Sequence, residues 1–142
     1  MIFSRIRLEL THYQLLDGAS IITAPDYDQL ETIYNSYCKY KEFESVMPFF
    51  KEQYQQSNAE VMGYYKEGHL IAYSLILKYP SRGSVMSEQF AWDYNEPNLR
   101  LGYRSLEHEC EFYKRQGYQY LYLGEHSKYK SKIDGYELLG PA

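Results

Sequence analysis

A helix that runs directly into a strand, near the end of the chain, most constrains the fold. Between Leu99 and Gln116 apolar residues recur at steps of 4, 3, 4 and 3, which predicts a helix with one buried face. The residues of this apolar stripe are Leu99, Tyr103, Leu106, Cys110 and Tyr113. Gly117 is typical of the left-handed residue that ends a helix, and the alternating Tyr and Leu of residues 118–124 predict a strand. We expect Glu111 to pair with Arg115 on the outer side of this helix.

Length, charge and cysteine content narrow the class of protein. A chain of 142 residues can bury roughly two-thirds of its unfolded surface without a disulfide or a metal, so we expect residues 1–142 to form one domain. The net charge of −4 and the scattered basic residues argue against a purely electrostatic grip on nucleic acid or on an anionic membrane. Cys38 and Cys110 lie on apolar helix faces, which predicts two buried thiols. Without a signal-like or membrane-spanning segment, we expect a cytoplasmic protein.

The remaining segments predict strands and helices in a mixed order. The alternating residues Ile6, Leu8 and Leu10, together with the apolar run 19–24, suggest an opening strand pair. Two helices are expected next, the first from Pro25-Asp26 onward and the second from about Met47 to Gln56. The period then changes to two, which predicts a hairpin from residues 61–65 and 69–78 and a further strand from 85–93. After the helix and strand described above we expect a short helix and an end strand. This order predicts an α/β fold, a mixed α+β sheet with helices on both faces.

The order of these elements resembles the GNAT (Gcn5-related N-acyltransferase) fold. In that family the loop before the third helix offers backbone N–H groups to the pyrophosphate of acyl-CoA, usually as Gln/Arg-x-x-Gly-x-Gly/Ala. Residues 98–104 of this chain read Asn-Leu-Arg-Leu-Gly-Tyr-Arg, with Arg104 at the second glycine position. Such a loop can bind a phosphate because the free backbone N–H groups and the dipole at a helix N-terminus both favour an anion. The resemblance implies an acyl-CoA N-acyltransferase-like fold, with acetyl-CoA or another acyl-CoA as donor. It places donor binding at Arg100, Leu101, Gly102, Tyr103 and Arg104.

The last part of the chain also resembles the C-terminal domain of arginyl- and leucyl-tRNA–protein transferases. The resemblance covers roughly residues 60–142 and rests on Tyr94-Asn-Glu-Pro97, Leu101-Gly102-Tyr103, Tyr120-Leu-Tyr-Leu-Gly124, Lys132-Ile133 and Pro141. That domain is a GNAT variant that takes an amino acid from aminoacyl-tRNA. The resemblance implies an aminoacyl-tRNA partner, whereas Gly135-Tyr136 resembles the Gly-Phe that closes a helix in ordinary GNAT proteins.

Amide-forming acyl transfer needs a group that removes the proton of the amine and a group that protonates the leaving group. In a regular strand 85–94, Glu88 shares its face with Met86, Phe90, Trp92 and Tyr94, an apolar setting that tunes a carboxylate for proton transfer. A solvent-facing position, or a bulge that turns Glu88 outward, is the alternative. Tyr129, just beyond the strand 118–124, stands where GNAT enzymes often have a tyrosine that protonates the leaving thiolate.

Four further residues are candidates for substrate binding. Trp92 and Tyr94 lie beside the start of the predicted helix, His126 can titrate near neutral pH, and Lys132 could meet a phosphate or a carboxylate. A loop histidine is more often a surface residue, and Lys128, Lys130 and Lys132 also fit a solvated helix face. No metal-ligand spacing, nucleophile elbow or P-loop motif is present, so we expect no metal.

The sequence therefore predicts an N-acyltransferase that moves an acyl or aminoacyl group onto the amine of a small molecule or a peptide. The donor stays open between acyl-CoA and aminoacyl-tRNA, because the mild negative charge disfavours tRNA while the motifs favour it. The alternative is a non-catalytic ligand-binding or interaction protein on the same fold. The sequence does not indicate an oligomeric state.

Overall fold

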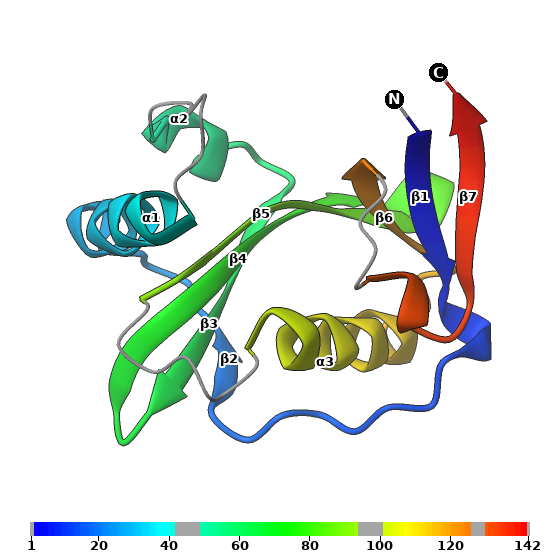
Figure 1. Cartoon of the computed structure of the whole chain (residues 1–142), viewed down its shortest axis with the longest axis horizontal. Coiled ribbons are helices and arrows are strands. Elements are labelled where there is room, and N and C mark those ends of the chain that lie inside the picture. The colour runs from blue at the N-terminus through cyan, green and yellow to red at the C-terminus, as the bar shows by residue number, and fades with distance from the viewer. Residues whose placement is uncertain (1, 42–48, 94–100, 126–129, 142) are drawn as a thin grey trace.

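The computed structural model describes residues 2–41, 49–93, 101–125 and 130–141. Its strands form a seven-stranded sheet in the order β2-β3-β4-β5-β6-β1-β7 (Figure 1). The strands are β1 (Ile2–Arg7), β2 (Ala19–Ile21), β3 (Ala59–Lys66), β4 (His69–Tyr79), β5 (Ser84–Trp92), β6 (Tyr120–Glu125) and β7 (Tyr136–Pro141). The α-helices are α1 (Tyr27–Lys41), α2 (Lys51–Tyr54) and α3 (Leu101–Arg115), and short 3-10 helices are η1 (Leu8–Leu10), η2 (Pro80–Arg82) and η4 (Lys130–Lys132).

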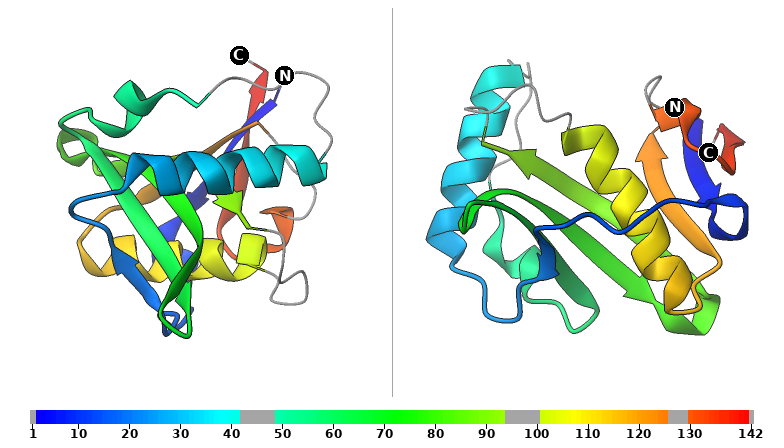
Figure 2. Two further views of the ribbon diagram at one scale, coloured as in Figure 1. Left: turned by 90° about the vertical axis from the view of Figure 1, so that its left-hand side faces the viewer. Right: turned by 90° about the horizontal axis from the view of Figure 1, so that it is seen from below.

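The sheet is mixed, as the sequence predicts. Neighbouring strands are antiparallel except β5 and β6, which run parallel. Helix α1 covers one face of the sheet and α3 the opposite face (Figures 1 and 2). The α/β fold class and the helices on both faces are therefore confirmed.

The predicted opening strand pair is wrong. The N-terminal strand β1 does not pair with β2 but lies between β6 and β7, antiparallel to both. Strand β2 instead pairs with β3 at the other edge of the sheet, through Ala19↔Tyr64 and Ile21↔Met62. The reason is burial, because Ile6 and Leu8 are fully buried in the core under α3, which an edge position could not provide.

Helix α1 confirms the helix that the sequence predicts from Pro25-Asp26 onward. Asp26 caps it by accepting hydrogen bonds from the backbone N–H groups of Asp28 (3.1 Å) and Gln29 (3.3 Å). Its inner side packs with residues of β3, β4 and β5 in one core cluster. Helix α2 is shorter than the predicted helix 47–56, and Met47 and Pro48 lie outside the described residues.

The predicted hairpin is confirmed as β3 and β4. Its turn uses Glu67 at φ 52° and Gly68 at φ 81°, the left-handed pair that a two-residue hairpin turn needs. The predicted strand after it is also confirmed, as β5.

Helix α3 is covered on two sides. Leu106, Cys110 and Tyr113 are buried against the sheet, as the apolar stripe predicts, whereas Leu99 lies outside the described residues. On its outer side the strap, which we define as residues 11–18, crosses the helix between η1 and β2 (Figure 1). The backbone N–H of Leu16 donates to His108 Nδ1 at 2.9 Å, and Lys114 Nζ donates to the carbonyl of Thr11 at 2.5 Å.

Because the strap covers the outer side of α3, the expectation that this side faces solvent is wrong at Glu111. Glu111, predicted to face outward, is buried, yet it makes the predicted pair with Arg115 (Nε to Oε2, 2.6 Å). The hydrogen bond from Arg115 lowers the pKa of Glu111. Cys38 and Cys110 are free, buried thiols, as expected. None of the described helices is long and apolar enough to cross a membrane.

Candidate functional site

The two parallel strands separate shortly after they begin to pair. Strands β5 and β6 pair only through Ser84↔Tyr120, Val85↔Leu121 and Met86↔Tyr122. Beyond Met86, the only strand that pairs with β5 in the described part of the chain is β4. Beyond Tyr122, β6 likewise pairs only with β1 among the described strands. We call the region between the separated parts, residues 87–92 of β5 and 123–125 of β6, the fork.

Each strand carries a bulge where the fork begins. Leu75 pairs with Gln89 and the next residue, Ile76, pairs with Ser87, so Glu88 is an extra residue in β5. In β6, Leu123 is an extra residue between the pairs Ser4↔Gly124 and Arg5↔Tyr122. Bulges bend a strand and redirect its side chains, and they are frequent beside active sites. Both bulges therefore mark the fork as the candidate site.

The bulge corrects the predicted setting of Glu88. The bulge interrupts the alternation between Met86, which pairs with Leu77, and the residues Phe90 and Trp92, which pair with Ser74 and Ala72. The ring of Phe90 lies 6.0 Å from the ring of Tyr37 on α1. Glu88 therefore does not lie on one apolar face with these residues, and its side chain is exposed. An exposed carboxylate at the start of the fork can still accept a proton.

The far end of the fork meets the start of α3. Trp92 and Leu101, 6% and 4% exposed, lie in one core cluster with residues of β3 and β4. The end of β5 and the first turn of α3 are therefore adjacent, and the N-terminus of the helix favours an anion there. Six residues of extended strand separate this end from the start of the fork, a length of roughly 20 Å.

A polar row that the sequence analysis missed lies beside the start of the fork. Tyr122, Arg5 and Glu137 are direct cross-strand neighbours on β6, β1 and β7. Arg5 Nε donates to Glu137 Oε2 at 2.8 Å, and Arg5 Nη1 donates to the hydroxyl oxygen of Tyr122 at 3.2 Å. The hydrogen bond with Glu137 raises the pKa of Arg5, so Arg5 keeps its positive charge. The alternation of Tyr with Leu in residues 120–123 was the available signal, but the partners lie more than 100 residues away.

The other predicted site residues do not gather in one place in the described structure. Trp92 is buried, Tyr103 is half-buried against the core, and Arg104 is exposed beside Leu16 and Asp17 of the strap. Lys132 is exposed on η4. Tyr94, Arg100, His126 and Tyr129 lie outside the described residues.

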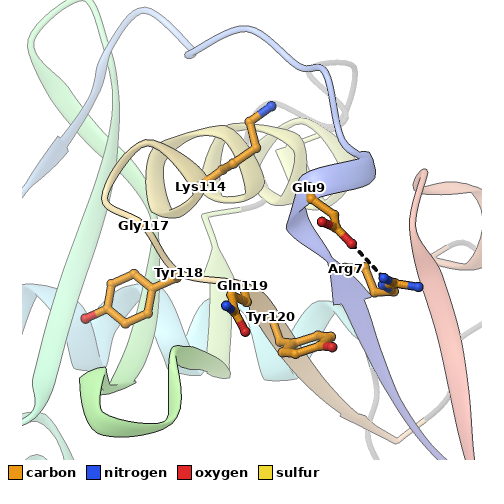
Figure 3. Close-up of a pocket in the computed structure, with 7 residues that line it drawn as sticks. All are labelled: Arg7, Glu9, Lys114, Gly117, Tyr118, Gln119 and Tyr120. Carbon is orange, nitrogen blue, oxygen red and sulfur yellow. Dashed lines mark hydrogen bonds and ion pairs between the residues drawn. The ribbon is translucent and has the colours of Figure 1, made fainter.

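A cavity of about 370 Å³ lies at the opposite end of β6 from the fork (Figure 3). Its charged lining is already paired, because Arg7 Nη2 contacts Glu9 Oε1 at 2.6 Å and Lys114 holds Thr11 and Glu111. The backbone N–H groups of Gly117, Tyr118 and Gln119 donate to carbonyls of the chain itself. These residues therefore have few groups left with which to hold a ligand.

A buried polar cluster fixes α3 to the sheet. Glu109, 2% exposed, accepts hydrogen bonds from the hydroxyls of Tyr64 on β3 and Ser74 on β4, the latter at 2.7 Å. Burial and the neighbouring Glu109 raise the pKa of Tyr64 well above its usual value. The cluster holds the helix in place along the sheet and leaves its first turn beside the fork.

This geometry suits a long donor with an anionic end. The first turn of α3 can hold the anion, and the edge of β5 that no described strand pairs with beyond Met86 can hydrogen-bond an extended arm. Tyr122, Arg5 and Glu137 supply polar side chains beside the start of the fork. The pantetheine arm of an acyl-CoA, which joins a pyrophosphate to a thioester, has this form. The residues present therefore fit such a donor.

The comparisons with known proteins concern the fold. No family model matches the sequence, and no curated protein sequence is significantly similar to it. Solved structures with the same fold include L-PGS from Bacillus licheniformis (TM-score 0.65, 14% identity, 87% of this chain and 46% of that one). They also include a putative GNAT acetyltransferase from Novosphingobium aromaticivorans (TM-score 0.63, 14% identity, 96% of this chain and 58% of that one).

A third structure is similar over most of its own length. It is the aminoglycoside acetyltransferase meta-AAC0020 from an uncultured soil metagenomic sample (TM-score 0.55, 15% identity, 83% of this chain and 84% of that one). The chain spans only about half the length of the first two structures. At these identities the likeness concerns the fold alone, and it shows that the chain has the fold of the GNAT acetyltransferases.

Proposed function

We propose that the chain is an N-acyltransferase that binds an acyl donor along the fork and transfers the acyl group to an amine. The observation that carries the proposal is the separation of β5 and β6 at two bulges, with the N-terminus of α3 at the far end. The structural similarity to acetyltransferases supports it.

Acyl-CoA is the donor that we place first. Its anionic phosphates would lie at Leu101 and Gly102 on the first turn of α3, and its thioester would supply the activated carbonyl near Glu88. The roughly 20 Å between these places requires an extended arm. Aminoacyl-tRNA is the second candidate. The motifs of the last part of the chain favour it, but the net charge of −4 supplies little general attraction for RNA.

Different groups of the fork could carry out the two parts of the reaction, removal of the proton from the amine and orientation of the carbonyl. Exposed Glu88 would take a proton from the attacking ammonium group, directly or through water. Backbone N–H groups of β5 at residues 87–91, where β4 is its only partner among the described strands, would orient the carbonyl, because donors fixed in advance stabilise the charge that develops on its oxygen. A small molecule or a peptide with a primary amine is the acceptor that this chemistry requires.

The test measures consumption of the donor. Purified protein is incubated with acetyl-CoA and separate primary amines (spermidine, kanamycin, L-lysine and a peptide with N-terminal alanine), and free CoA thiol is followed. A parallel reaction uses labelled aminoacyl-tRNA, with transfer of the label into an amide as the readout. We expect amine-dependent release of CoA.

Matched variants locate the site. Gly102→Val adds a branched side chain at the first turn of α3 and should abolish donor consumption. Gln116→Val places the same side chain at an exposed position just after the last residue of α3 and should leave the rate unchanged. Equal rates for both variants would move the donor site away from the fork. Donor binding without transfer to any amine would instead indicate a non-catalytic binding protein.

A further inference from the structure

A groove beside the strap carries charged side chains that the proposed function does not use. Figure 2 shows the strap crossing the outer side of α3 in the view from below. A cavity of about 420 Å³ is lined by residues 13–17 of the strap and by Arg104 and Glu107 of α3. A second cavity, of about 170 Å³, shares Leu16, Asp17 and Arg104 with the first and extends to the hairpin of β3 and β4. We call the two cavities together the strap groove.

Two contacts fix the strap over α3. The backbone N–H of Leu16 donates to His108 Nδ1 at 2.9 Å, and the hydroxyl oxygen of Tyr13 accepts the backbone N–H of Asp134 at 3.0 Å. The side chains of Leu16 and Tyr13 also pack against the buried core. The walls of the strap groove are therefore formed before a ligand binds, which lowers the cost of ordering them on binding.

Three charged side chains line the strap groove without pairing to one another. Arg104 and Glu107 lie one turn apart on the same side of α3, and Asp17 lines the same cavity from the strap. None of the three side chains makes a hydrogen bond or an ion pair to another described residue. Burial raises the pKa of Glu107, and the charge of Arg104 offsets only part of this rise. A partly desolvated carboxylate beside a single cation in a cleft is typical of a binding site.

The signs of these charges select the ligand. Arg104 stands where the phosphate-binding loop of the GNAT family has its second glycine, but the carboxylates of Asp17 and Glu107 line the same cavity and repel a phosphate. A guanidinium group binds a carboxylate through two parallel N–H donors, whereas carboxylates bind an ammonium group. A zwitterion, which has both an ammonium group and a carboxylate, therefore satisfies all three side chains.

The smaller cavity adds a preference for an apolar side chain. Its lining includes Ile71, Leu101 and the ring of Tyr65. Lys66 also lines it but already interacts with another group of the chain. The smaller cavity meets the larger one at Arg104, so a ligand carboxylate held there leaves its side chain beside this apolar surface.

From this arrangement we infer that the strap groove binds an α-amino acid with an apolar side chain. Its carboxylate lies on Arg104 and its ammonium group on Asp17 and Glu107. The site is separate from the fork, and binding there needs no step of acyl transfer. The inference therefore does not rest on the proposed function.

Isothermal titration of the full chain with L-leucine and L-phenylalanine tests the inference. Two analogues test the charges one at a time, because N-acetyl-L-leucine has no ammonium group and L-leucinamide has no carboxylate. We expect saturable binding of the amino acids and at least roughly tenfold weaker binding of each analogue. No binding of either amino acid, or analogues that bind as tightly as leucine, would overturn the inference.

Matched variants place the ligand within the strap groove. Arg104→Gln should weaken leucine binding at least roughly tenfold and leave leucinamide unaffected, because leucinamide lacks the group that Arg104 holds. Glu107→Gln should weaken leucine binding likewise and leave N-acetyl-leucine unaffected. The controls Arg82→Gln and Glu52→Gln remove exposed charges on η2 and α2 and should bind leucine as the wild type does. Circular dichroism checks the fold, and Asp17→Asn on the strap replaces any variant that does not fold.

Two further outcomes separate this inference from the proposed function. Equal leucine affinity of the wild type and of the variants in the strap groove would overturn the inference and leave the fork untouched. Saturating CoA should not displace leucine, and displacement would assign the strap groove to the donor and overturn the inference. Leucine binding by a protein that consumes neither acetyl-CoA nor aminoacyl-tRNA would uphold the inference and overturn the proposed function.

Discussion

Among single residues, His108 combines deep burial with a titratable ring. It packs between the rings of Tyr64 and Phe112 and accepts a hydrogen bond from the strap through Nδ1. Its Nε2 therefore carries the proton, and this atom is buried without a hydrogen-bond partner in the described structure. Burial lowers the pKa of His108 from 6.5 to about 4. A second proton would charge a buried ring and break the bond to Leu16.

This lowered pKa predicts a loss of stability in acid. Between pH 6.5 and about 4 the unfolded chain binds a proton at His108 that the folded chain does not, so the free energy of unfolding falls as the pH falls. The loss across this pH range is roughly 3 kcal/mol. Denaturant unfolding at pH 7 and pH 4 should show a smaller loss for His108→Gln than for the wild type. Equal losses would mean that His108 titrates alike in both states.

Glu88 shows which properties of a single residue can be predicted from the sequence. Alternation correctly placed β5, because Val and Trp at its ends occupy buried positions on the sheet. The bulge depends on how β4 pairs with β5, and no local pattern in β5 encodes that register. The position of Glu88 in the strand was therefore predictable, whereas the direction of its side chain was not.

At the scale of elements, α3 depends on both apolar and polar contacts. The spacing of its apolar residues predicted the buried positions of Leu106, Cys110 and Tyr113. Leu106→Ala should reduce the free energy of unfolding by roughly 2 to 5 kcal/mol, because it leaves a cavity in the core. Chemical denaturation measures this loss, and a change below about 0.5 kcal/mol is the range of surface positions and would contradict the packing.

The Glu109 cluster makes a separate prediction for the same helix. Glu109→Ala leaves the hydroxyls of Tyr64 and Ser74 without their shared acceptor, at a cost of roughly 2 to 5 kcal/mol. Ser74→Ala should therefore cost less in the Glu109→Ala background than in the wild type. A double-mutant cycle measures the coupling, and additive losses would show that the two side chains do not interact.

At the scale of the whole molecule, β1 joins the two ends of the chain. It pairs with β6 and β7, and it brings Arg5 beside Tyr122 and Glu137. Ile6→Ala should cost roughly 2 to 5 kcal/mol, as for an interior core residue. Leu139→Ala on the outer strand β7, where the side chain is 44% exposed, should cost less than about 0.5 kcal/mol. Similar losses for both variants in thermal or denaturant unfolding would contradict the interior position of β1.

The insertion of β1 also explains which part of the site could be predicted. The α3 stripe, the hairpin and β5 follow from local periods of 3.6 and 2, and the order of these elements along the chain favours the GNAT fold. The pairing of residues 2–7 with strands more than 100 positions away has no local signal, so the row from Tyr122 to Glu137 was missed. The strap was missed for the same reason, because its contact with His108 joins residues 92 positions apart.

The central claim is that the fork between β5 and β6 holds the acyl donor. Amide hydrogen exchange with and without acetyl-CoA, and again with aminoacyl-tRNA, tests it most directly because each backbone N–H reports for itself. The account predicts slower exchange on donor binding at residues 87–91 of β5 and in the first turn of α3, with no change at Gly117, Tyr118 and Gln119. Protection at these three residues instead, or no protection by either donor, would contradict it.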